Sequence, residues 1–422
     1  MRIGIISTRI CGSDGVSLEI RKWAAILRRQ GHELYYCAGE LEGGLEGKLV
    51  PQMHFRDPSI EKLQAQIFSQ DCDQSAARKQ MEALRDSLRA ELAEFLERFH
   101  IQLVIVENAL AIPMNVPLAL ALRDLIAARS LPAIAHHHDF MWERERFTLS
   151  WMKPELEQVF PPNLDSITHV VINSLARAQL LARTGIEAEV IPNIFDFTHF
   201  HYGLDKAALG FRQAVGVDER DWLVLQPTRI IPRKGIEDAI ELVRQLRLPV
   251  NRGQLFDRDV KLVLSHPSGD EGQEYFRNLQ DQARTGGVPL IYAAEKVAIS
   301  ERGPKQPGQF RLWDAYLNAD FVTYPSHIEG FGNAFLEAVY YRLPLLIRRY
   351  PVFISDIEPL GFDLITFDEE ITPAVLGQVL AVIVDPNRRR RMTEWNFNLA
   401  KQHFSYRAVA GKFRKMIERC MP

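Results

Sequence analysis

Short apolar runs alternate with amphipathic helical segments along the first half of the chain, and this alternation limits the possible folds more than any other feature. The runs that we expect to form strands are residues 2–7, 33–37, 103–106, 133–136 and 169–172. Helical spacing fills the gaps between them, as in residues 17–30, where Gly31 ends the segment. Apolar strands separated by helices are typical of parallel, doubly wound sheets. The pattern therefore predicts an α/β fold.

The same alternation begins again after a boundary near residues 191–193. Strands are predicted over 222–226, 261–265, 290–293, 321–324 and 345–347, and helices over 236–246 and 334–341. A chain of 422 residues is too long for one ordinary core. We therefore predict two Rossmann-like domains, residues 1–195 and 196–403, that face each other across a cleft. Residues 404–422 are predicted to form a C-terminal helix that packs near the domain junction, and residues 58–100 to form a long helical segment.

Composition and charge exclude several classes of protein. Hydrophobic residues make up 46% of the chain and the net charge is −3, which fits a globular protein without a nucleic-acid surface. The four cysteines are scattered and are interpreted as reduced thiols. No apolar stretch reaches the roughly 18 residues that span a bilayer, and the first apolar run is interpreted as a strand and not as a signal peptide. We expect a cytoplasmic protein with no integral membrane association. The four arginines at 388–391 are interpreted as part of a solvated helix.

The segment at 327–337 reads HIEGFGNAFLE and carries the most chemical information. It follows a predicted strand and opens a helix, so that Gly330 and Gly332 lie where backbone N–H groups can approach an anion closely. Glu329 lies in the loop and Glu337 about two turns into the helix. Two carboxylates at this spacing can accept hydrogen bonds from hydroxyl groups, one on a transferred sugar and one on a ribose.

A second constellation, TRIIPRKG at 228–235, also lies between a predicted strand and a helix. Arg229 and Lys234 are separated by a turn that contains proline, so both side chains can converge on one anion. Preorganised cations of this kind stabilise the charge that develops on a pyrophosphate leaving group.

Two further motifs follow predicted strands of the first domain. The loop CGSDGV at 11–16 supplies Gly12 and Gly15 after the first strand, which is a common arrangement in α/β proteins. Three consecutive histidines, 136–138, end another strand and invite a metal hypothesis. Neighbouring residues of a strand point to opposite faces and no other metal motif accompanies the run, so we predict that there is no zinc site. Arg144 and Arg146 follow on the same loop and could meet an anionic acceptor.

Together these motifs resemble glycosyltransferase family 4, the large group of retaining glycosyltransferases with the two-domain GT-B fold. The resemblance covers nearly the whole chain. It implies that Arg229 and Lys234 bind the donor diphosphate in place of a metal, and that His138 contacts the transferred sugar. It also implies that Glu329 faces the donor sugar and that Glu337 holds the nucleotide ribose. The remaining residues expected beside the donor are Gly12, Gly15, Gly330, Phe331, Gly332 and Asn333.

The resemblance further implies catalysis without a metal or cofactor and with retention at the transferred carbon. No residue stands out as a nucleophile, and a front-face reaction needs none, because the departing phosphate can take the acceptor proton. Catalysis is then mostly positioning and electrostatics. No carboxylate in the motifs is an evident general base for an inverting displacement.

The acceptor is less constrained by the motifs. The segment ENALAIPMN at 107–115, with the triple-histidine loop, resembles enzymes that mannosylate glucosylglycerate-type compatible solutes. We therefore expect a hexose, mannose or glucose, to be transferred from a nucleotide-sugar such as GDP-mannose to a small soluble acceptor. A lipid-linked or cell-envelope glycan acceptor is the main alternative. A nucleotide-sugar epimerase and a non-catalytic nucleotide-sugar-binding protein share the fold and stay open, as does the oligomeric state.

Overall fold

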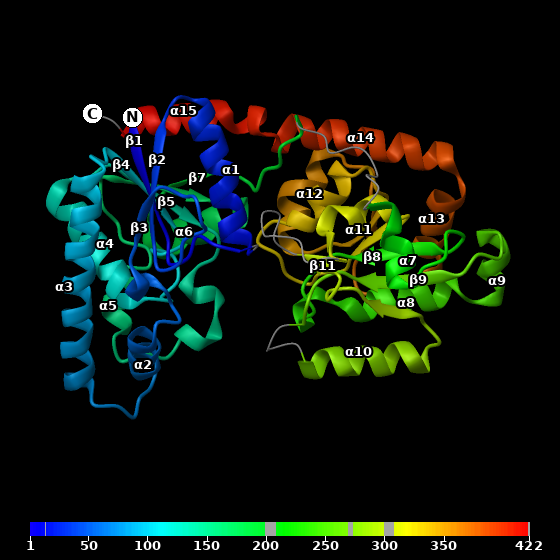
Figure 1. The fold of residues 1–422 in the computed structure, drawn as a ribbon, viewed down its shortest axis with the longest axis horizontal. Coiled ribbons are helices and arrows are strands. Elements are labelled where there is room, and N and C mark those ends of the chain that lie inside the picture. Colours follow the sequence, from blue (N-terminus) through cyan, green and yellow to red (C-terminus); the bar gives the residue numbers. More distant parts are fainter. Residues whose placement is uncertain (13, 199–207, 269–272, 299–307, 421–422) are drawn as a thin grey trace. The chain divides into compact units, whose positions relative to one another are not determined.

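The computed structural model describes residues 1–12, 14–198, 208–268, 273–298 and 308–420. The chain divides into two compact units (Figure 1). Unit 1 comprises Met1–Ile194 together with Tyr406–Pro422, and unit 2 comprises Phe195–Ser405. The C-terminal helix therefore belongs to the unit that contains the N-terminus.

Unit 1 is built on a seven-stranded sheet with the order β3-β2-β1-β4-β5-β6-β7, in which all neighbours are parallel. The strands are β1 (Arg2–Ile6), β2 (Glu33–Ala38), β3 (Gly47–Leu49), β4 (Leu103–Glu107), β5 (Ala133–His137), β6 (Ile167–Val171) and β7 (Ala188–Val190). The strand order reverses between β1 and β4. In open α/β sheets, ligands bind outside the carboxyl ends of the strands at such a point.

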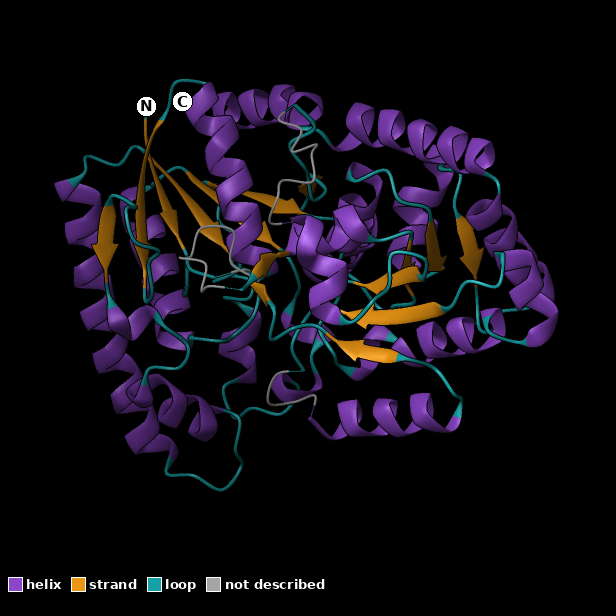
Figure 2. Ribbon diagram, turned by 45° about the vertical axis from the view of Figure 1, so that its right-hand side comes forward, coloured by secondary structure: helices purple, strands orange, loops and turns teal. Residues whose placement is uncertain are grey.

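Helices cover both faces of this sheet (Figure 2). They are α1 (Gly15–Arg29), α2 (Pro58–Ile67), α3 (Gln74–Arg98), α4 (Val116–Arg129), α5 (Lys153–Glu157), α6 (Ser174–Thr184) and α15 (Tyr406–Cys420). Side chains alternate along each strand, so Val104 and Val106 pack toward α3 and α4, whereas Leu103 and Ile105 pack toward α1 and α15. The long segment predicted over 58–100 is two helices, α2 and α3, because Asp73 caps the start of a second helix.

The C-terminal helix α15 completes one hydrophobic face of unit 1. Its side chains Phe413 and Met416 are fully buried. The Phe413 ring packs edge-on against Trp23 of α1, with 4.4 Å between ring centroids, and the Gln30 side chain donates a 2.8 Å hydrogen bond to the Ala410 carbonyl.

Unit 2 repeats the architecture with a six-stranded parallel sheet in the order β10-β9-β8-β13-β14-β15. Its strands are β8 (Trp222–Gln226), β9 (Val260–Leu264), β10 (Leu290–Tyr292), β13 (Phe321–Tyr324), β14 (Leu345–Arg348) and β15 (Ile365–Phe367), and a separate pair is formed by β11 (Val297–Ala298) and β12 (Phe310–Arg311). The order reverses between β8 and β13, which is again where loops at the carboxyl ends can converge on a ligand.

The helices of unit 2 bury apolar side chains against this sheet. They are α7 (Phe211–Val215), α8 (Ile236–Leu246), α9 (Pro249–Arg252), α10 (Gln273–Thr285), α11 (Leu312–Asn318), α12 (Asn333–Tyr340), α13 (Pro373–Val384) and α14 (Pro386–Phe404). The arginine run at 388–391 lies in α14, as predicted, and two of its members are exposed. Arg388 instead forms an ion pair with Asp363.

The predicted α/β class with parallel sheets is thus confirmed in both units. Among the described helices, none combines the length and the apolar character needed to cross a membrane.

The packing of α15 generates a stability prediction. Phe413→Ala should destabilise unit 1 by about 3–5 kcal/mol, because it removes a buried ring and leaves a cavity beside Trp23. Guanidinium unfolding followed by tryptophan fluorescence measures the loss. Lys415→Ala, at an exposed position of the same helix, is the control. Equal unfolding midpoints for the two variants would show that α15 does not stabilise unit 1.

Candidate functional site

In unit 2, the loops that follow β8 and β13 meet at the reversal of strand order. Lys234 ends the short helix η5 (Pro232–Lys234), and its ammonium forms an ion pair with Glu329 from the other loop. Both side chains are only 10% exposed. The same loops are joined by the His327 N–H, which donates to the Arg233 carbonyl at 2.9 Å, and by the Arg233 guanidinium, which donates to the Ile328 carbonyl at 2.9 Å. The predicted motifs are therefore brought together in space.

Gly235 makes this approach possible. Its backbone φ is +58°, in the left-handed region, and a Cβ at this position would lie 2.4 Å from the carbonyl oxygen of Pro325. A Cβ atom cannot lie this close to a carbonyl oxygen, so only glycine allows the backbone at 235 to approach the backbone at Pro325.

The charges of this cluster are coupled. Burial alone would raise the pKa of the Glu329 carboxyl, but the charges of Lys234 and Arg233 hold it below its ordinary value. Burial, together with the charges of Lys234 and Arg229, lowers the pKa of His266 to about 4. Arg229 is exposed, yet its charge also helps to lower the pKa of Lys234, behind burial and Arg233. Three cations, Arg229, Arg233 and Lys234, and a neutral imidazole thus share one neighbourhood, which suits a multiply charged anion.

The glycine turn before α12 has a rigid support. Gly332 caps this helix with φ +132°, and an added Cβ would lie 2.6 Å from the Tyr350 hydroxyl. That hydroxyl donates a 2.5 Å hydrogen bond to the Phe331 carbonyl. The first backbone N–H groups of α12, beginning at Asn333, follow directly after this turn, and a helix N-terminus favours anions.

Glu337 lies in α12, as predicted, and accepts a 2.6 Å hydrogen bond from the hydroxyl of Tyr316 in α11. Burial and the charge of Glu337 raise the pKa of Tyr316 well above its ordinary value, so this hydroxyl stays protonated and donates. The Glu337 side chain itself remains partly exposed. Tyr316 therefore orients the Glu337 carboxylate, which can still reach a ligand. The sequence motif around Glu337 did not reveal Tyr316 as its partner.

In unit 1, the loop after β1 leads into the N-terminus of α1. Gly12 has φ +83°, its carbonyl accepts a 2.6 Å hydrogen bond from Arg21, and Gly15 begins the helix. Asp14 caps α1 by accepting hydrogen bonds from two backbone N–H groups. Ser13 of this motif lies outside the described residues.

The three histidines at the end of β5 point alternately to opposite faces of the sheet. On one face, Nε2 of His137 lies 2.9 Å from Nδ1 of His169 in β6. On the other face, His136 Nδ1 and His138 Nε2 lie 2.9 Å and 3.2 Å from the same oxygen, Oε2, of Glu107 at the end of β4. The pairing of β4 with β5 brings these residues together. The sequence signal that could have indicated the cluster is Glu107, a carboxylate at the end of an otherwise apolar strand.

Among the described residues, Glu107, His136 and His138 could together hold a metal ion, because their potential ligand atoms all lie within 4.8 Å of one another. Both imidazole nitrogens, however, approach one carboxylate oxygen at hydrogen-bonding distance. Metal ligands would instead direct their lone pairs at a common ion. We interpret the group as a hydrogen-bonded cluster. The absence of a metal requirement stays a prediction.

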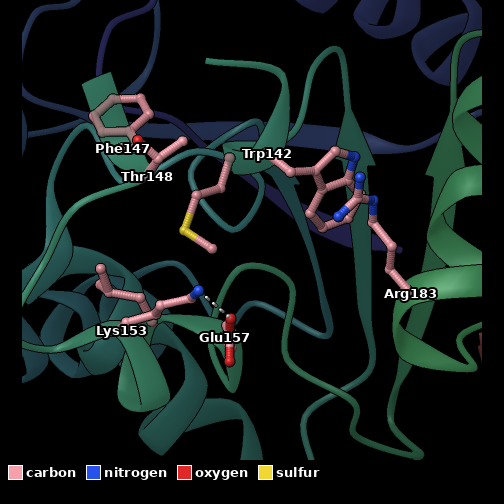
Figure 3. A pocket seen from close by; sticks show the side chains of 8 residues that line it. Trp142, Phe147, Thr148, Lys153, Glu157 and Arg183 are labelled. Atoms are coloured by element: carbon pink, nitrogen blue, oxygen red, sulfur yellow. Dashed lines mark ion pairs between the residues drawn. The ribbon is translucent and has the colours of Figure 1, made fainter. Parts of the chain in front are cut away.

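Both predicted arginines of the loop after β5 contact neighbouring side chains, and their role toward an anionic acceptor stays a prediction. Arg144 forms an ion pair with Asp139, and the Arg146 guanidinium lies over the Phe147 ring at 4.6 Å. A cavity of about 260 Å³ lies close by (Figure 3). Its basic lining residues are Lys153 and Arg183, which were not predicted. The full lining is Met141, Trp142, Phe147, Thr148, Lys153, Leu156, Glu157 and Arg183.

Comparison with known proteins identifies the chain. Residues 210–395 match the family described as "Glycosyl transferases group 1", a range that lies within unit 2 and contains its motifs. Two proteins named mannosylglucosylglycerate synthase, from Petrotoga mobilis and Thermotoga maritima, are 32% and 31% identical to this chain. Each alignment covers 96% of this chain, and they cover 98% and 97% of the two relatives.

The chain belongs to the group 1 glycosyl transferases. It is therefore an enzyme that transfers a sugar, and the family predicted from the motifs is confirmed.

Solved structures agree at the level of the fold. A sucrose-phosphate synthase from Thermosynechococcus elongatus aligns with a TM-score of 0.68 at 14% identity, over 99% of this chain and 98% of that one. Anabaena HepE, solved with UDP and glucose, aligns with a TM-score of 0.66 at 14% identity, over 99% and 100%. The GT-B fold class predicted for this glycosyltransferase is thus confirmed.

The close approach at Gly235 can be tested directly. Gly235→Ala should lower the free energy of unfolding of unit 2 by at least about 1–2 kcal/mol, from the left-handed backbone alone, and the contact with Pro325 adds to this. Differential scanning calorimetry measures the change. Gly253→Ala is the matched control, because its φ is −60° and its Cβ would meet nothing within 4 Å. Equal melting profiles for both variants would contradict this account of the loop.

Proposed function

We propose that this glycosyltransferase transfers mannose from a nucleotide-mannose, with GDP-mannose as the donor to test first, to a glucosylglycerate-type acceptor. The observation that carries the proposal is the similarity to two mannosylglucosylglycerate synthases over 96% of the chain. That similarity includes unit 1, which the group 1 match at 210–395 does not reach. Relatives that shared only the donor-binding unit would say less about the acceptor.

The cations of unit 2 support a role in binding the donor diphosphate. Lys234 and Arg229 lie close enough for each charge to affect the pKa of His266, and the α12 N-terminus offers backbone donors after Gly332. We assign the diphosphate to these groups, beside the residues 330–333. Cations held in place before the reaction stabilise the leaving group without reorganisation.

The two carboxylates of the motif take different roles in this proposal. Glu329, ionised and held by Lys234, faces the transferred sugar. Glu337, oriented by Tyr316, accepts hydrogen bonds from the nucleotide ribose. His138 of unit 1 contacts the transferred sugar, and the loop with Gly12 and Gly15 faces the donor phosphate and the acceptor.

The reaction proceeds with retention and without a metal or other cofactor. The departing phosphate takes the proton of the acceptor hydroxyl while Arg229 and Lys234 hold its charge, so that positioning and electrostatics supply most of the catalysis. The acceptor is a small anionic molecule, since a glycerate carries a carboxylate, and we place the reaction in the cytoplasm.

Incubation of the purified enzyme with GDP-mannose and glucosylglycerate tests the proposal. We expect release of nucleoside diphosphate only when donor and acceptor are both present, undiminished activity in EDTA, and an α-linked product from the α-linked donor. The product is identified by mass and its anomeric coupling by NMR.

Each failure in this assay has its own meaning. Donor turnover without acceptor would indicate an epimerase or a hydrolase, and binding without turnover a non-catalytic protein. Activity that needs added Mg²⁺ or Mn²⁺ would show a metal-bound diphosphate. A β-linked product would overturn the retaining mechanism, and transfer only to a lipid-linked acceptor would replace the proposed substrate.

The diphosphate assignment predicts the effect of removing Arg229. Arg229→Ala should lower turnover by roughly 10² or more, the scale for removing one stabiliser of transition-state charge. The melting temperature should hardly change, because the side chain is exposed. Arg252→Ala removes an exposed arginine from α9 of the same unit and controls for net charge. Turnover within a few-fold of the control would contradict the assignment.

A further inference from the structure

Glu107 is a buried carboxylate that the donor-binding motifs do not explain. Its residue is 1% exposed, at the end of β4 beside the reversal of strand order in unit 1. Within the described ranges of the chain, its ion-pair partners are the imidazoles of His136 and His138. An ionised carboxylate is strongly disfavoured in such a place unless a positive charge accompanies it. The cluster therefore needs a proton on one of the two imidazoles.

The surroundings select His138 for that proton. His136 is 1% exposed, and its ring stacks on Trp23 with 4.1 Å between centroids. Burial and the charge of His138 outweigh Glu107 and lower the pKa of His136. Burial would also lower the pKa of His138, but the hydrogen bond and charge of Glu107 raise it above its ordinary value, helped by Glu19 and Asp139. The two histidines hold the pKa of Glu107 at about 2, although burial opposes them.

The other charged groups near this cluster are themselves paired. Glu19 of α1 accepts a 2.6 Å hydrogen bond from Lys22, and Asp139 forms an ion pair with Arg144. These pairs leave Glu107 as the direct counter-charge of His138.

The backbone around His138 is fixed as well. Its N–H donates a 3.0 Å hydrogen bond to the Asn108 side-chain oxygen, and the Asn108 amide donates to Asp139 at 2.8 Å. Asn108 has φ +59°, a left-handed conformation that asparagine accepts more readily than most residues. Nε2 of His138 is directed at Glu107. Because the other ring nitrogen, Nδ1, has no hydrogen-bond partner among the described residues, it is the donor available to a ligand. The side chain is 10% exposed, whereas Glu107 is 1% exposed.

We propose that Glu107 is a positioning residue, which holds His138 in one orientation and in its protonated form so that Nδ1–H can donate to the transferred sugar or the departing phosphate. This inference rests on the proposed function, which takes His138 to contact the transferred sugar. Glu107 itself touches no substrate and acts through His138.

The protonation state can be measured without substrate. Histidine in the intact enzyme is labelled with ¹⁵N, and its ring signals are followed against pH, with His138→Asn used to assign the His138 signal. We expect the His138 imidazolium to persist above pH 6.5, the ordinary pKa of histidine. In Glu107→Gln, which keeps the shape and a hydrogen-bond acceptor but not the charge, it should titrate at least about one pH unit lower. A neutral His138 at pH 6.5 in the wild-type enzyme would overturn the proposal, with no need for a folded variant.

Kinetics supply a readout that a purely structural role would not change. Glu107→Gln should lower kcat by about 10-fold or more, the scale for an outer residue that orients a functional imidazole, with the donor KM nearly unchanged. Because the active form is protonated, activity falls as pH rises through the pKa of His138, and this fall should occur at lower pH in the variant. His137→Asn alters the opposite face of the same strand and should keep the wild-type pH profile. The same profile in Glu107→Gln as in wild type, or the same shift in both variants, would overturn the proposal.

Two further outcomes separate this inference from its premises. A wild-type enzyme that makes no product would refute the proposed function, while the titration would still decide whether Glu107 keeps His138 protonated. Stoichiometric zinc or another transition metal in the purified enzyme, lost in Glu107→Gln, would overturn the inference, because the cluster would then be a metal site.

Discussion

Parallel strand pairing is the constraint on which the rest of this enzyme depends. In a parallel sheet all carboxyl ends lie along one edge, so each loop that leaves a strand there can meet the loop of its neighbour. In unit 2 the adjacency of β8 and β13 brings Lys234 to Glu329 across 95 positions of sequence. In unit 1 the pairing of β4 with β5 brings Glu107 to the histidines. The side chains to which we assign chemistry occur in or beside these loops.

A second theme is that the buried charges of both units are paired with groups of opposite charge. Lys234 and Glu329 keep each other ionised at 10% exposure, and a lone member would be expected to lose its charge in such surroundings. Tyr316 orients Glu337 without neutralising it. In unit 1, the buried Glu107 carboxylate is likewise paired with the His138 imidazole. Pairs of this kind hold functional groups in place before a substrate arrives, which lowers the cost of organising them during the reaction.

The two units differ in which known proteins they resemble. The group 1 match lies within unit 2, which contains the loops of Lys234 and Glu329, and the solved structures at 14% identity share the fold alone. Similarity to the mannosylglucosylglycerate synthases extends over both units. Unit 1 also contains the features that local motifs did not predict, the Glu107 cluster and the cavity lined by Lys153 and Arg183.

The sequence by itself determined the elements and most of the candidate site, because periodicity and strand-to-helix turns are local properties. Strands 222–226 and 321–324 and helix 236–246 have the predicted bounds, and Glu329 and Glu337 lie in the predicted loop and helix. Five short strands of the described residues, β3, β7, β11, β12 and β15, were missed, since two or three residues carry too little pattern. Only the tertiary structure decided that 58–100 forms two helices, that α15 joins unit 1, and that Arg144 pairs with Asp139. The partners Tyr316 and Glu107 depend on which strands and helices become neighbours, and that is a long-range outcome of packing.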